Sequence, residues 1–188
     1  MDGGSKLKQR ILGLVVIIAL VVLVSFFFGP QAAATYYLRA AETAFEEGKL
    51  ENAMAYLKKS SYFDAKNFKT HALLGRTFVA LNRQKGNVHE VEAQNLYRES
   101  INQFGSAFAF GLNERNYPSY GELLDDYGTA YWRIGEYDKA DNLFLERIGK
   151  YPDSSFLARF LVAVDYTERL NRAAEARDVI LPAFTASN

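Results

Sequence analysis

Two stretches of the chain repeat one pattern of small, aromatic and apolar residues, and this self-similarity constrains the fold more than any other feature. Between residues 121 and 154 the pattern is Gly128, Tyr131, Gly135, Tyr137, Ala140, Phe144 and Pro152. Between residues 34 and 67 the matching positions are Ala41, Gly48, Leu50, Ala53 and Leu57. A repeat of about 34 residues is typical of solenoids built from helix pairs. The small residues let two antiparallel helices approach each other, and the proline ends the second helix.

These spacings resemble the tetratricopeptide repeat (TPR) family over most of the chain that follows residue 33. The resemblance implies an all-α fold, a TPR-type α-solenoid of about four helix pairs, of which the second is interrupted and the fourth degenerate. It also implies a protein-interaction module. The fold by itself identifies neither the partner nor a reaction.

Two of the copies depart from the pattern. One opens at Gly75 but resumes about six residues late, at Ala93 and Tyr97, which predicts an insertion near 82–92. The last copy places acidic residues where an apolar residue is expected, among them Asp165, so we expect a solvated C-terminal cap.

An uncharged apolar run, ILGLVVIIALVVLVSFFF, occupies residues 11–28. As a helix it is about 27 Å long, close to the ~30 Å thickness of a hydrocarbon core. The run therefore predicts a transmembrane helix over 11–28, after an N-terminal segment 1–10. A linker, 29–33, then leads to a TPR-like domain over 34–188.

The charges beside this run predict its orientation. Lys6, Lys8 and Arg10 precede it, whereas the first charge after it is Arg39. The excess of basic residues predicts a cytoplasmic N-terminus and, in a bacterium, a periplasmic C-terminal domain on a single-pass inner-membrane protein. The absence of Asn-x-Ser/Thr glycosylation sites favours a bacterial source. A cleaved signal peptide is the alternative, because three alanines at 32–34 follow the run, although the run is longer than such peptides usually have.

Composition excludes several classes of function. Lys and Arg number 22, as do Asp and Glu, so the chain lacks the basic excess with which proteins bind nucleic acid. Cysteine is absent, which excludes disulfides, thiolate metal sites and cysteine nucleophiles. The histidines are His71, in an expected helix, and His89, in the insertion; neither has the spacing of a metal site. No phosphate loop, nucleophile elbow or catalytic triad is present. We expect no enzyme, no cofactor, no metal and no small-molecule substrate.

The TPR resemblance implies that the first helix of each pair lines a groove that binds a protein partner. The corresponding residues are Leu38, Glu42, Phe45, Glu46, Lys69, Arg76, Val79, Glu122, Asp125, Thr129, Trp132, Arg133, Phe156, Arg159 and Tyr166. Phe45, Trp132 and Tyr166 are either anchors for the partner or packing residues between helices. Arg76 and Arg133 are expected to face solvent and to steer the partner by their charge.

A second candidate surface is the insertion over 105–119, which contains Phe108, Phe110 and Tyr117. Long loops in compact domains are uncommon and often functional. This loop is either a contact site or a cover for the apolar edge of the repeats.

These features lead to one principal hypothesis and two alternatives. The principal hypothesis is a non-catalytic, membrane-tethered scaffold, accessory subunit or assembly factor of a larger bacterial membrane complex, which binds protein partners through the groove. The alternatives are a translocon-associated, chaperone-like binder of emerging periplasmic polypeptides and the substrate-recruiting subunit of an envelope hydrolase.

Overall fold

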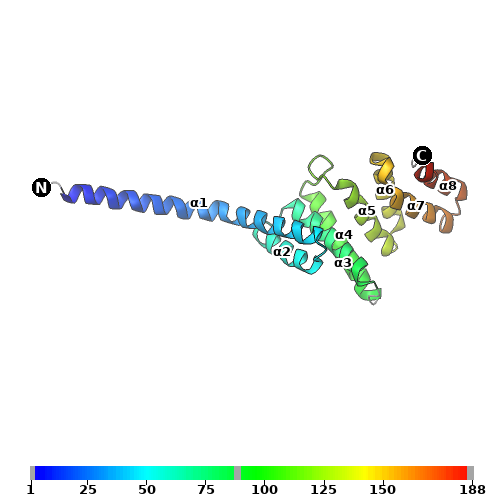
Figure 1. Cartoon of the computed structure of the whole chain (residues 1–188), viewed down its shortest axis with the longest axis horizontal. Coiled ribbons are helices and arrows are strands. Elements are labelled where there is room, and N and C mark those ends of the chain that lie inside the picture. The colour runs from blue at the N-terminus through cyan, green and yellow to red at the C-terminus, as the bar shows by residue number, and fades with distance from the viewer. Residues whose placement is uncertain (1–2, 87–89, 186–188) are drawn as a thin grey trace.

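The computed structural model describes residues 3–86 and 90–185, and Figure 1 shows a helical domain from which one long helix projects. The helices are α1 (Gly3–Glu46), α2 (Leu50–Phe63), α3 (Phe68–Lys85), α4 (Glu90–Ala109), α5 (Tyr120–Arg133), α6 (Tyr137–Lys150), α7 (Phe156–Glu168), α8 (Ala173–Ile180) and the short α9 (Pro182–Thr185). A 3-10 turn, Pro152–Ser154, precedes α7. The described residues contain no strand.

Successive helices form four pairs, α1 with α2, α3 with α4, α5 with α6 and α7 with α8. Each pair then packs against the next along the chain, which makes a TPR-like helical repeat (Figure 1). The all-α, helix-pair part of the predicted fold is therefore confirmed.

Small residues set the closeness of the helices within a pair. A Cβ atom on Gly128 would lie 2.5 Å from Cε1 of Phe144, and one on Gly75 would lie 2.6 Å from Cε1 of Phe104. Both phenylalanines are fully buried, as is Leu57 at the same position of the first pair. Glycine is required here because the ring of the second helix occupies the space that a side chain would fill.

This packing corrects the predicted register of the second pair. The contact of Phe104 with Gly75 corresponds to that of Phe144 with Gly128. We expected Tyr97 at this position, so the pattern resumes seven residues later than predicted. The extra residues lengthen both helices, because α3 continues to Lys85 and α4 begins at Glu90. The described part of the insertion near 82–92 is thus mostly helical.

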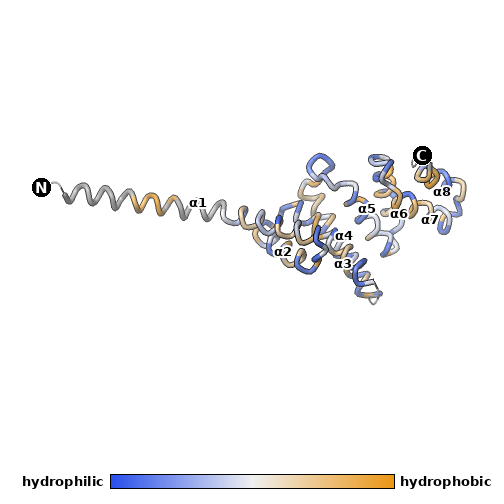
Figure 2. The backbone as a smooth tube through the Cα atoms, viewed as in Figure 1, coloured by the Kyte–Doolittle hydropathy of each residue, from blue (hydrophilic) through white to orange (hydrophobic). Residues whose placement is uncertain are grey.

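The N-terminal helix differs from expectation. Among the described residues, no helix combines the length and the apolar character that crossing a membrane requires. This finding contradicts the transmembrane helix predicted over 11–28, and with it the single-pass, inner-membrane localisation and the periplasmic domain. The side chains described in this run are those of 14–18 and 20, which are apolar and exposed (Figure 2). The other side chains of the run, and those of 1–10, lie outside the described residues.

The linker predicted over 29–33 is helical in the structure. α1 is one helix of 44 residues that includes Pro30 and the whole of 29–33. Ala34 is buried where α1 meets α2, and its carbonyl oxygen accepts a hydrogen bond of 2.9 Å from Ser60 Oγ. The first half of the first repeat is therefore the end of α1.

The two acidic residues that predicted a solvated cap differ in the structure: Asp178 on α8 is exposed, as expected, whereas Asp165 is buried. Asp165 is buried between α6 and α7, and both of its carboxylate oxygens accept hydrogen bonds from Arg169, at 2.7 and 2.9 Å. Arg169 also binds Asp138 at 2.8 Å. An ion-pair cluster therefore joins α6 to the end of α7.

Asp141 makes this junction sensitive to pH. Burial and the neighbouring Asp165 carboxylate raise the pKa of Asp141 to about 7, against the opposing effect of Arg169. Asp138 adds to the rise. A folded pKa above the unfolded value means that the stability contributed by this group is fully present below about pH 4 and is lost as the pH rises through 7.

We therefore expect Asp141→Asn, which mimics the protonated carboxyl group, to stabilise the chain above pH 7 and to have little effect near pH 4. We expect the stabilisation to be on the order of 1–2 kcal/mol, because one pKa unit corresponds to about 1.4 kcal/mol and the titration is shared between the adjacent Asp141 and Asp165 carboxyl groups. Urea unfolding of both proteins between pH 4 and pH 8 measures the difference. A difference that is constant over this range would contradict the assignment, and Asp178→Asn on the exposed side of α8 is the control.

Candidate protein-binding groove

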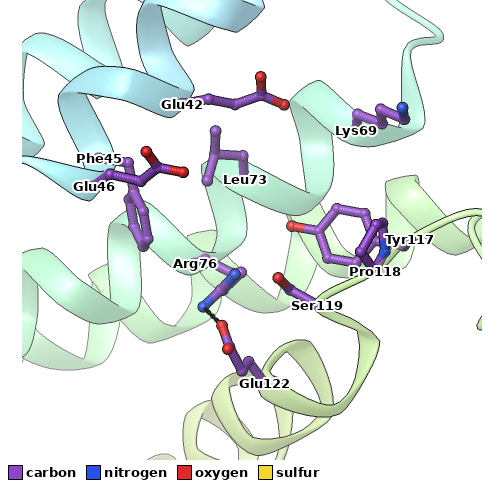
Figure 3. A pocket seen from close by; sticks show the side chains of 10 residues that line it. All are labelled: Glu42, Phe45, Glu46, Lys69, Leu73, Arg76, Tyr117, Pro118, Ser119 and Glu122. Atoms are coloured by element: carbon purple, nitrogen blue, oxygen red, sulfur yellow. Dashed lines mark hydrogen bonds and ion pairs between the residues drawn. The ribbon is translucent and has the colours of Figure 1, made fainter.

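A cavity of about 470 Å³ opens between α1, α3, the start of α5 and the loop that precedes α5. Figure 3 shows the side chains from these four segments that line it. The lining residues are Glu42, Phe45, Glu46, Lys69, Leu73, Arg76, Tyr117, Pro118, Ser119 and Glu122. We call this cavity the α1–α5 groove.

Arg76 lies on the side of the groove formed by α3 and α5. Its Nε donates a hydrogen bond of 3.1 Å to Asp126 Oδ2. Its Nη2 donates one of 2.5 Å to Glu122 Oε2, which Figure 3 shows as a dashed line. The guanidinium also lies over the Phe45 ring, 5.3 Å from its centroid. Although burial lowers the pKa of Arg76, Asp126 and Tyr117 raise it above the ordinary value. Arg76 is thus always charged, and it joins three helices.

Asp126 is the buried partner in this arrangement. Its second oxygen, Oδ1, forms an ion pair with Arg83 Nη1 at a distance of 3.0 Å. Burial raises the pKa of Asp126, while Arg83 and Arg76 act against that rise. The prediction that Arg76 faces solvent as a free steering charge is therefore wrong, because only 13% of its side chain is exposed. Arg133, in contrast, is exposed, and it lies over the Trp132 ring.

The remaining charges in the groove are mostly acidic. Glu42 and Glu46 are exposed, and neither makes an ion pair with any residue that the structure describes. Glu122 is exposed as well, with one oxygen on Arg76. Lys69 lies across the groove from Glu46 and is the other basic residue of the lining (Figure 3).

The predicted groove residues divide into three groups in the structure. Six of them line the α1–α5 groove: Glu42, Phe45, Glu46, Lys69, Arg76 and Glu122. Four are buried between helices and are not available at the surface: Leu38, Val79, Thr129 and Arg159. The others lie further along the solenoid, so the structure does not bring all the candidates together.

The candidates further along the solenoid are engaged to different degrees. Asp125 is held by Arg147 Nε at 3.0 Å. Trp132 is half-buried with its ring against Tyr137, in the packing role that we considered for it.

Two aromatic candidates remain near the C-terminus. Tyr166 is half-buried beneath Arg172. Phe156 is exposed and stacks on Phe160. Neither lies in the α1–α5 groove.

The aromatic residues of the 105–119 insertion also take different positions. Phe108 is on α4, half-buried, and stacks on Tyr127 at 6.0 Å, so it packs against the core. Phe110 is exposed at the end of α4 and contacts the His71 ring at 5.2 Å. Tyr117 packs on the core and also lines the groove. The insertion thus covers the edge of the repeats and contributes one side of the groove.

Sequence reasoning missed three lining residues. Leu73 forms the floor, and Pro118 and Ser119 form the rim beside α5. The spacing to Arg76 could have identified Leu73, because residues three apart lie on the same face of a helix. No comparable signal exists for a loop.

Both ring nitrogens of His71 are engaged by groups of the protein itself. His71 is buried, with Nδ1 2.7 Å from Gln103 Oε1 and Nε2 2.9 Å from the Ala65 carbonyl oxygen. His89 lies outside the described residues. Within the described ranges, no three His, Asp or Glu side chains gather as metal ligands would.

The fold and the groove together define a helical-repeat protein of the TPR-like class. Among solved structures, the chain is similar to the crystal structure of MamA, with a TM-score of 0.63 and 19% identity; the match covers 100% of this chain and 95% of that one. At this identity the likeness supports the fold alone. No protein-family model matches the chain, and no curated protein matches it.

Proposed function

We propose that this chain is a non-catalytic scaffold or assembly subunit that binds a segment of a protein partner in the α1–α5 groove. The observation that carries this proposal is the groove itself, where helices from three repeats and one loop converge on a single cavity. Peptide-sized clefts between helices are a common mode of protein recognition. The helical-repeat fold supports a protein partner rather than a small molecule.

The lining chemistry suits binding better than catalysis. The floor and one wall offer Phe45, Leu73 and Tyr117, which provide apolar and aromatic contact area. Large, rigid side chains in a concave site contribute most of the binding energy of an interface. The lining residues include neither histidine nor cysteine, and we assign no reaction to them.

Photo-crosslinking from within the groove tests the proposal in cells. Lys69 is exposed at the rim, so Lys69→p-benzoylphenylalanine places a reactive group in the cavity without touching the buried ion pairs. We expect a discrete crosslinked partner from position 69 and none from the same group at Glu51, an exposed position on α2 outside the groove. Equal products from both positions would contradict the assignment of the groove.

A further inference from the structure

We propose that the groove selects a basic segment, one in which Lys or Arg side chains flank a bulky apolar residue. This inference rests on the function proposed above and adds the chemistry of the partner.

The acidic residues near the end of α1 lie at positions where negative charge destabilises a helix. Glu42 and Glu46 are one turn apart on the same helix face, where like charges repel and cost about 0.2–0.5 kcal/mol. α1 ends at Glu46, and its last turn holds no basic residue. Negative charge at a helix C-terminus is unfavourable because the helix dipole is itself negative there. Both carboxylates therefore weaken the isolated helix, and a cation between them would relieve both effects.

The protein itself supplies little compensation. Arg76, the basic residue nearest the centre of the groove, is committed to Asp126 and Glu122. Lys69 is on the opposite rim in Figure 3 and makes no ion pair with a described residue. The α1 side of the groove thus keeps two uncompensated carboxylates. A residue that breaks a local rule without a compensating contact is expected at a functional site.

The apolar part of the lining defines the second requirement. Leu73 lies between Glu42 and Arg76 in Figure 3, with the Phe45 ring on one side and Tyr117 on the other. A Leu, Met or aromatic side chain of the partner would cover this floor, while its basic neighbours would reach Glu42 and Glu46. The geometry therefore favours a basic, amphipathic segment over an acidic one. An acidic segment would find only Lys69 to balance its negative charge, because Arg76 is already paired.

A selection of random phage-displayed peptides for binding to the purified protein tests the inference. We expect the selected peptides to be rich in Lys or Arg beside a bulky apolar residue. We expect Glu42→Gln combined with Glu46→Gln to weaken their binding at least tenfold, measured by fluorescence anisotropy, without lowering the melting temperature. Added salt should weaken the binding too, because the carboxylates are exposed. The matched control is Glu51→Gln combined with Glu99→Gln, which removes the same charge from α2 and α4 outside the groove.

The other outcomes separate the two proposals. Peptides without basic residues that crosslink to p-benzoylphenylalanine at position 69, and that ignore the Glu→Gln changes, would overturn the basic-segment inference and leave the groove as the binding site. Peptides that crosslink equally well to p-benzoylphenylalanine at position 51 and at position 69 would overturn both the basic-segment inference and the groove as the binding site. A selection that enriches no peptide would do the same.

Discussion

Replacing Arg76 with glutamate is expected to lower the free energy of unfolding by about 3–5 kcal/mol, because it breaks a largely buried ion pair. Asp126 would lose one of its two guanidinium partners and gain a carboxylate beside it. Glu122 would face the same new charge, and the stacking on Phe45 would be lost. Thermal and urea unfolding followed by circular dichroism measure the effect.

The control is Lys69→Glu, which makes the same change of charge at an exposed position of the same groove. It should alter stability by no more than about 0.5 kcal/mol. Equal melting temperatures for the two variants would show that Arg76 is a surface charge, as the sequence suggested, and not a link between α3 and α5.

Gly128→Val is expected to cost about 3 kcal/mol or more, the upper end of the usual range for overpacking a core. The new Cβ would lie 2.5 Å from a ring carbon of Phe144, and that ring is fully buried, so it cannot move aside into solvent. Separation of α5 from α6 is the remaining way to relieve the clash. Loss of helicity or of soluble protein would be the strongest form of this result.

Gly149→Val on α6 separates packing from helix propensity. Gly149 is exposed, and a Cβ there would meet nothing within 4 Å. Valine is at least as favourable as glycine inside a helix, so stability should be unchanged or slightly higher. If Gly128→Val behaved like this control, the close approach of α5 and α6 would be refuted.

The sequence predicted the helix pairs wherever the repeat spacing is uninterrupted. The two complete copies placed Gly128 on Phe144 and Ala41 beside Leu57 because their spacing is that of a helix hairpin. The second pair was assigned the wrong register for a physical reason. Seven residues are close to two helical turns, so Tyr97 and Phe104 lie on nearly the same face, and the pattern fits either. Only the contact with Gly75 distinguishes them.

The groove could be predicted only in part. Glu42, Phe45 and Arg76 follow from their places on the first helices, and all three line the cavity. Tyr117 reaches the groove because the loop before α5 folds back over α3, which depends on tertiary packing that no local pattern encodes. Likewise, the charge of Arg76 was evident, but its burial against Asp126 depends on how α5 packs on α3.

The length of α1 has a mechanical consequence. An unbroken helix of 44 residues is about 66 Å long, and its last turn carries one wall of the groove. A helix of this kind acts as a lever arm. For any movement in which α1 stays rigid, a tilt of its N-terminal end also moves Phe45 and Glu46, which line the cavity.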